Sequence, residues 1–238
     1  MFASRVTIVV GHFGSGKTEI AVNGAIRRAA GAERVALVDL DVVKPCFRSR
    51  STREQMAEHG VRVVAPQGEL AHADLPVVLP DVRRLFGETG LAVILDVGGD
   101  PVGTRALGSV SDAVPVAETE VLLVLNFRRP YTESVDDAAA MVREIGHAAR
   151  LPVNGLVSNT HLLDETTPDL VREGYSLAAD TGRRLGIPVV AVCCDERVRP
   201  ALRDGEFSCP LFALRRLIHP PFEQPRLTMK VGPLFALN

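Results

Sequence analysis

Seven short runs of apolar residues set the strongest limit on how this 238-residue chain can fold. Each run is nearly continuous and shows no alternation of apolar and polar positions. Strands that are covered by helices on both faces have this pattern, because neither face meets water. The runs therefore predict a buried, mostly parallel sheet of about seven strands. They are Val6–Val10, Val35–Val38, Val61–Val64, Leu91–Leu95, Val121–Leu125, Val153–Val157 and Val189–Val192.

Between most of these runs lie segments long enough to form a crossover helix. Repetition of strand, helix and strand predicts a three-layer α/β fold with helices on both faces of the sheet. Pro168 suits the first turn of a helix, and Gly31, Gly146 and Gly186 are expected to end helices. The expected helices are Thr18–Ala30, Leu75–Glu88, Glu133–Ala149 and Pro168–Leu185.

The segment Gly11-His-Phe-Gly-Ser-Gly-Lys-Thr18 matches the phosphate-binding pattern G-x-x-x-x-G-K-[ST] between an expected strand and an expected helix. Its glycines permit positive φ and close backbone approach, so that successive N–H groups form a nest for a phosphate at a helix N-terminus. Lys17 is expected to reach the β- and γ-phosphates, and Thr18 to bind Mg²⁺. The nucleotide contacts are expected to lie at Gly11, His12, Phe13, Gly14, Ser15, Gly16, Lys17, Thr18 and Glu19.

Carboxylates follow two of the other apolar runs. Asp39 and Asp41 end one strand, and Asp96 and Asp100 end another, with Gly99 between the latter two. The carboxyl ends of neighbouring strands meet at one edge of a doubly wound sheet, and Mg²⁺ prefers oxygen ligands. Asp96 is therefore expected to hold Mg²⁺ through water, and Asp41 to activate the attacking water. Asp39, Gly99 and Asp100 are expected to sense the γ-phosphate; each carboxylate would otherwise be an ordinary turn or cap residue.

Together, the phosphate loop, Asp39-Leu-Asp41 and Asp96-Val-Gly-Gly-Asp100 resemble the CobQ/CobB/MinD/ParA nucleotide-binding family, over roughly residues 5–195. The resemblance implies the P-loop NTPase fold and Mg²⁺-dependent ATP hydrolysis that switches conformation for a protein partner or cargo. Many members carry a signature lysine directly after the first loop glycine, which reaches the partner subunit's nucleotide. His12 stands at that place, so a homodimer of that kind would lack this contact.

The nucleotide base is expected to be adenine. The stretch Val157-Ser-Asn159-Thr-His-Leu162 has the Asn of the guanine motif Asn-Lys-x-Asp but neither its Lys nor its Asp. In the resembled ATPases an Asn at this strand end contacts adenine, which implies that role for Asn159. A strand-end cap is the alternative role for Asn159. Asp164 and Asp195 lie close enough in sequence for GTP to remain an alternative nucleotide.

Composition excludes several classes of protein. The formal charge of −2 argues against a strongly basic nucleic-acid module, and no apolar run approaches a membrane span. With four cysteines and no secretory signal, a cytoplasmic protein is expected. Residues 1–218 are expected to form one nucleotide-binding domain, with 219–238 as an extension on the domain or a partner.

Two other functions fit the same motifs. One is an ATP-dependent small-molecule kinase or ligase of the dethiobiotin-synthetase or cobyrinate-amidase kind, with its substrate near Arg48, Arg50 and Arg53. The other is a slow, nucleotide-dependent binding module.

Overall fold

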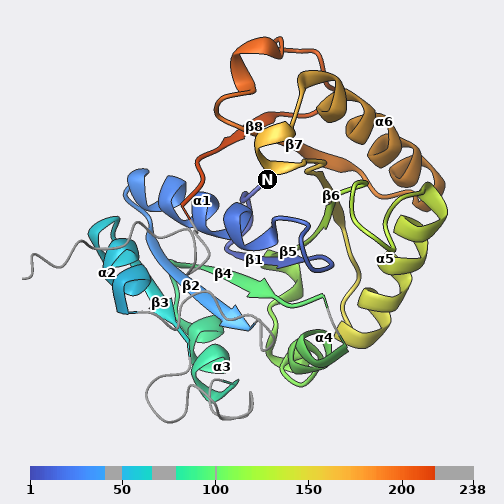
Figure 1. Ribbon diagram of the computed structural model, residues 1–238. Helices are drawn as coiled ribbons and strands as arrows, with labels where there is room; N and C mark the ends of the chain where they lie inside the picture. Colours follow the sequence, from blue (N-terminus) through green and yellow to red (C-terminus); the bar gives the residue numbers. More distant parts are fainter. Residues whose placement is uncertain (41–49, 66–78, 100, 218–238) are drawn as a thin grey trace, which may run out of the picture.

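The computed structural model describes residues 1–40, 50–65, 79–99 and 101–217. In this part of the chain eight strands form one sheet, in the order β3-β2-β4-β1-β5-β6-β7-β8 (Figure 1). All neighbouring strands pair in parallel. The strands are β1 (Val6–Val10), β2 (Arg34–Leu40), β3 (Val61–Val64), β4 (Leu91–Val97), β5 (Thr119–Leu125), β6 (Gly155–Ser158), β7 (Val189–Asp195) and β8 (Leu211–Leu214).

The predicted α/β class is confirmed, and the described residues hold eight strands where about seven were expected. All seven apolar runs contribute to strands, and β8 is the strand that the pattern missed. β8 has four residues, at the edge of the sheet, and only Phe212 and Leu214 are buried. A half-covered edge strand alternates, so it lacks the continuous apolar run that identified the others.

Helices cover both faces of the sheet, as predicted. On one face α1 (Lys17–Ala30) and α2 (Arg50–Glu58) pack, with Ile20, Ala21 and Met56 in the core. On the other face lie α3 (Leu79–Gly87), α4 (Pro101–Gly108), α5 (Val135–Ala149) and α6 (Pro168–Leu185). Single 3₁₀ turns occur at Ser111–Ala113, Val116–Glu118, Leu163–Glu165 and Arg199–Ala201.

Local sequence explains most helix ends. α6 has Thr167 as N-cap, whose hydroxyl accepts from the Leu170 N–H at 3.2 Å, and Pro168 in its first turn. Gly186 ends α6 with φ +69°, a left-handed conformation that favours glycine. Gly31 likewise follows the last residue of α1. The expectation for Gly146 was wrong, because α5 continues through it to Ala149.

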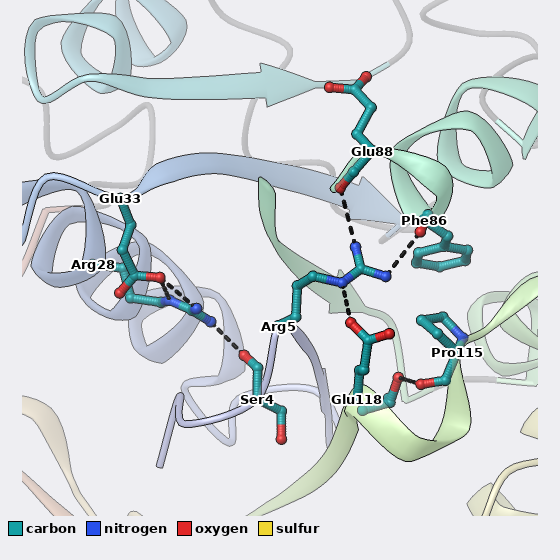
Figure 2. A network of polar contacts seen from close by, with 9 residues as sticks. Ser4, Arg5, Arg28, Glu33, Phe86, Glu88, Pro115 and Glu118 are labelled. Atoms are coloured by element: carbon teal, nitrogen blue, oxygen red, sulfur yellow. Dashed lines mark hydrogen bonds and ion pairs between the residues drawn. The ribbon is translucent and has the colours of Figure 1, made fainter. Parts of the chain in front are cut away.

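An arginine network joins three segments at the amino end of β1 (Figure 2). Arg5 pairs with Glu118 through Nε and donates through Nη2 to the carbonyl of Phe86 at 2.9 Å. Its Nη1 donates to the carbonyl of Glu88 at 3.4 Å. This network anchors the end of α3 and the turn before β5 to β1, at the edge opposite the phosphate-binding pattern.

Candidate nucleotide-binding site

The segment that matches the phosphate-binding pattern lies where the sheet reverses its strand order. From β1 the chain passes to β2 and β3 on one side of the sheet, and β5 to β8 lie on the other. The carboxyl end of β1 therefore lies between those of β4 and β5. In open α/β sheets a crevice forms at this switch point, which is where ligands bind.

Residues Gly11–Thr18, here called the glycine loop, form a tight turn that leads into α1. The Ser15 N–H donates to the carbonyl of His12 at 3.1 Å. Gly14 has φ +79° and Gly16 has φ +89°, values that residues with a β-carbon rarely adopt. α1 starts at Lys17, whose side chain is buried, with 5% of the residue exposed. Successive N–H groups at the N-terminus of a 14-residue helix are suited to hold an anion.

Residues that follow β5 and β6 hold the glycine loop from one side. Asn159 donates through Nδ2 to the carbonyl of Ser15 at 2.7 Å, in a buried position. A β-carbon at Gly16 would lie 2.3 Å from this Nδ2, so glycine at position 16 makes room for Asn159.

Gly14 is held from the same side by two side chains. Asn126 donates through Nδ2 to the carbonyl of Gly14 at 3.3 Å, and Arg129 donates to the same oxygen through Nε at 3.1 Å. Asn126 also bonds both the N–H and the carbonyl of His161, at 3.3 and 3.2 Å. The end of β5 thus ties the glycine loop to the end of β6.

On the other side, the loop after β4 packs directly on the glycine loop. A β-carbon at Gly99 would lie 2.1 Å from the carbonyl oxygen of Gly11 and 2.8 Å from the nitrogen of His12. Only glycine permits this contact of backbone with backbone. The same loop begins after Val97, directly past Asp96.

Two buried carboxylates lie beside the loop on adjacent strands. Asp39 of β2 and Asp96 of β4 are register partners, and Asp96 is also the register partner of Val9 in β1. Register partners share a face of the sheet, and Val9 belongs to the core on the α1 side. Asp39 is 2% exposed and Asp96 is 0% exposed. Buried carboxylates require nearby positive charge, so the pair fits Mg²⁺, which takes one or two carboxylates together with phosphates and water.

The described residues contain no cluster of three or more His, Cys, Asp or Glu that could hold a metal ion by themselves.

Burial lowers the pKa of two histidines, one within the glycine loop and one beside it. Burial lowers the pKa of His12. The charge of Glu144 raises this pKa to a smaller extent, and the charge of Lys17 lowers it to a still smaller extent. Burial, followed by the charge of Arg129, lowers the pKa of His161 to about 4.

The structure brings together most, but not all, of the residues expected at this site. The loop, Asp39, Asp96, Gly99 and Asn159 lie at the end of β1 and its neighbours, whereas Asp41 and Asp100 lie outside the described residues. Phe13 is 69% exposed, and Glu19 accepts a hydrogen bond from the Leu217 N–H.

Asn126 and Arg129 bond the glycine loop and His161 lies beside it, and sequence reasoning did not single out these three residues. Asn126 follows an apolar run directly, which is the signal that identified Asn159, so it was open to the same reasoning.

No helix of the described residues is long and apolar enough to cross a membrane.

No protein-family model matches the chain, and no curated protein matches it either. Among solved structures, it is similar to the cell division protein FtsY of Thermotoga maritima, with 23% identity and a TM-score of 0.56 over 80% of this chain and 62% of that one. Chloroplast FtsY of Physcomitrella patens shares 25% identity, with a TM-score of 0.51 over 79% of this chain and 57% of that one.

A third similar structure is the 54-kDa signal recognition particle protein of Aeropyrum pernix K1 in complex with GDP. It shares 18% identity, with a TM-score of 0.50 over 77% of this chain and 40% of that one. The chain thus spans about three fifths of the two FtsY structures and less of the third. The strand order, the loop after β1 and these similarities show that the chain has the α/β fold of P-loop NTPases.

Proposed function

We propose that this protein is a Mg²⁺-dependent P-loop ATPase of the MinD/ParA-like class, which hydrolyses ATP to switch conformation for a protein partner or cargo. The observation that carries the proposal is the glycine loop with its buried Lys17, beside the carboxylates of Asp39 and Asp96 on adjacent strands. A basic phosphate nest next to paired acidic oxygens suits a nucleoside triphosphate with its metal.

Each residue has a role in this proposal. Lys17 and the loop N–H groups bind the β- and γ-phosphates, while Thr18 and, through water, Asp96 hold Mg²⁺. When bound, Mg²⁺ supplies positive charge that offsets the charge developing on the phosphates. Asp41 orients and deprotonates the attacking water. Asp39, Gly99 and Asp100 respond to the presence of the γ-phosphate.

The coupling between site and switch follows from the contact of Gly99 with Gly11 and His12. A loop in backbone contact with the glycine loop must move when that loop moves. Movement of the segment after β4 is therefore the expected signal to a partner.

ATP is proposed over GTP, although one of the similar structures is solved with GDP. Guanine recognition needs a carboxylate free to accept from the base. Asp164 and Asp195, the two candidates, both pair with Arg197, at 2.9 and 2.8 Å. Leu162 stands at the place of the guanine-motif Asp.

Asn159 has a partner within the protein. Its Nδ2 is engaged by the Ser15 carbonyl and the residue is 3% exposed, which favours a role in shaping the loop.

The two other functions make different predictions for turnover. A small-molecule kinase or ligase would show turnover stimulated by a small acid, with phosphate transferred to it. A slow binding module would bind ATP tightly, release phosphate slowly and bind a partner only in one nucleotide state.

The decisive experiment measures binding of ATP and GTP, together with phosphate release, with and without Mg²⁺. Lys17→Ala is expected to abolish binding, and Asp41→Ala to abolish release while binding persists. Asp180→Asn is the matched control, since Asp180 pairs with Arg183 on α6, far along the helix from the site edge. Parental turnover in either test variant would refute the proposal.

A further inference from the structure

Arg129 lies flat against the glycine loop although it belongs to the turn after β5. Its Nε donates to the carbonyl of Gly14 at 3.1 Å. A β-carbon at Gly14 would meet Nε at 3.0 Å, Cδ at 3.2 Å and Cζ at 3.5 Å. The Arg129 side chain from Cδ to Cζ therefore lies against Gly14.

The turn that carries Arg129 is well fixed. The Arg129 N–H donates to the carbonyl of Asn126 at 3.2 Å, and the Arg129 carbonyl accepts from the N–H and the hydroxyl of Thr132, at 3.2 and 3.1 Å. Asn126 in turn accepts from the Arg128 N–H at 3.0 Å. The guanidinium is thus positioned before any ligand arrives, which lowers the entropy that binding would cost.

The terminal nitrogens of Arg129 make no hydrogen bond or ion pair with any described residue. Its exposed neighbour Arg128 provides the contrast, since Arg128 pairs with Glu173 at 2.5 Å. A half-buried guanidinium that uses Nε for the protein and keeps two Nη groups available is suited to an anionic oxygen.

The position of Arg129 decides which part of a nucleotide it meets. Asp39 and Asp96 lie on the β2 and β4 side of β1, and Arg129 lies on the β5 side, near His161. If the β-phosphate occupies the loop and the γ-phosphate faces the carboxylates with Mg²⁺, the α-phosphate and nucleoside lie on the β5 side. The α-phosphate is the anionic group on that side.

Building on the proposed function, we propose that Arg129 is a nucleotide-binding residue whose Nη groups donate to the α-phosphate while Nε keeps the glycine loop in shape. ATP and ADP share the α-phosphate, so Arg129 contributes equally to the binding of both. It differs in this respect from Asp41, whose proposed role is at the γ-phosphate.

Arg129→Gln is the variant that separates the two tasks of the side chain. The amide nitrogen of Gln stands as many bonds from the backbone as Nε of Arg, so the hydrogen bond to Gly14 can persist. The Nη groups are lost. Arg128→Ala is the matched control, because it removes an adjacent exposed arginine whose partner is Glu173.

The experiment measures the dissociation constants of labelled ADP and ATP by titration, with the unfolding temperature as a check on the fold. Arg129→Gln is expected to weaken both nucleotides by at least about tenfold, as for the loss of one charge-assisted hydrogen bond. Arg128→Ala is expected to bind both as the parent does. Replacement of one α-phosphate oxygen by sulfur is expected to weaken parental binding, and to have less effect in Arg129→Gln.

Three results would overturn the inference. They are unchanged ADP binding in Arg129→Gln, a loss confined to ATP, or a sulfur effect of parental size in the variant. If Lys17→Ala loses nucleotide while Arg129→Gln keeps it, the proposed function stands and this inference falls. If the parent protein binds neither nucleotide, both fall.

Discussion

Replacement of Gly99 by alanine tests whether the loop after β4 is locked to the glycine loop. The added β-carbon would lie 2.1 Å from the carbonyl oxygen and 2.4 Å from the carbonyl carbon of Gly11. Non-bonded contacts of a β-carbon under 3.0 Å essentially do not occur, so the two backbones must separate by about 0.9 Å. Gly99 does not have positive φ, so the cost arises from this contact alone.

The expected loss of stability is about 1–3 kcal/mol, the usual range for overpacking in a dense interior. Backbone can move only by disturbing its own hydrogen bonds, so a value near the upper end is expected. Displacement of Gly11 and His12 also distorts the phosphate nest, which should weaken ATP binding. Urea unfolding monitored by circular dichroism measures the free energy of unfolding, and nucleotide titration measures the ATP affinity.

Gly87→Ala is the control for the change of residue type. Gly87 ends α3, has no positive φ, and a β-carbon there would have nothing within 4 Å. Its replacement should leave stability unchanged or raise it by up to about 1 kcal/mol, because glycine is the more flexible residue in the unfolded chain. If Gly99→Ala matched Gly87→Ala in both unfolding free energy and ATP affinity, the proposed contact between the loops would be refuted.

Three further replacements test the surroundings of the site. Asn159→Ala leaves the buried Ser15 carbonyl without its donor, so we expect a loss of about 1–3 kcal/mol in urea unfolding. ATP and GTP affinity should then fall by the same factor, whereas a changed ratio would indicate contact with the base. Asn23→Ala removes hydrogen bonds of 2.9 Å to both the N–H and the carbonyl of Arg215. The amide of Arg215, which follows β8, should then exchange its hydrogen faster, while ATP affinity stays unchanged. An unchanged exchange rate would contradict this prediction. The pKa of His161, about 4 when folded, lies below the unfolded value of about 6.5, so the unfolded chain binds more protons between these values. The contribution of His161 to the free energy of unfolding is therefore fully present above about pH 6.5. It is lost as the pH falls toward 4, by at most about 1.4 kcal/mol per pH unit. His161→Gln should lose less stability between pH 7 and pH 5 than the parent, and equal losses would show that this histidine is not the cause.

The parts of the fold that follow from local pattern were predictable from sequence. A strand with two covered faces must be apolar along its whole length, which is why the seven runs marked strands in the right places. The glycine loop was predictable for a similar reason, because positive φ at Gly14 and Gly16 restricts the residue type directly. Gly146 was misread because a glycine in a helix costs only about 1 kcal/mol, and packing of α5 outweighs that preference.

The roles of Asn126, Arg129 and Asn159 could not be read from local pattern. Each depends on which loop of the chain meets the glycine loop, and the contacts join residues more than 110 positions apart. Asn159 was expected at the base because a strand-end amide is a common ligand group. Whether its donor points to a nucleotide or to a backbone carbonyl depends on the distance between β6 and the loop, which sequence does not specify.

The pairing of Asp39 with Asp96 shows how strand order creates chemistry that neither strand has alone. The two residues are 57 positions apart in sequence, and each follows an ordinary apolar run. Because β2 pairs with β4 in parallel register, both carboxylates emerge on the α1 face at the same height. The chain then places Lys17, the first residue of α1, at the end of β1 beside them. Like charges buried side by side are unfavourable unless positive charge lies close. Lys17 supplies one such charge, a divalent cation at this edge would supply more, and the adjoining glycine loop is suited to the phosphate that would accompany the cation.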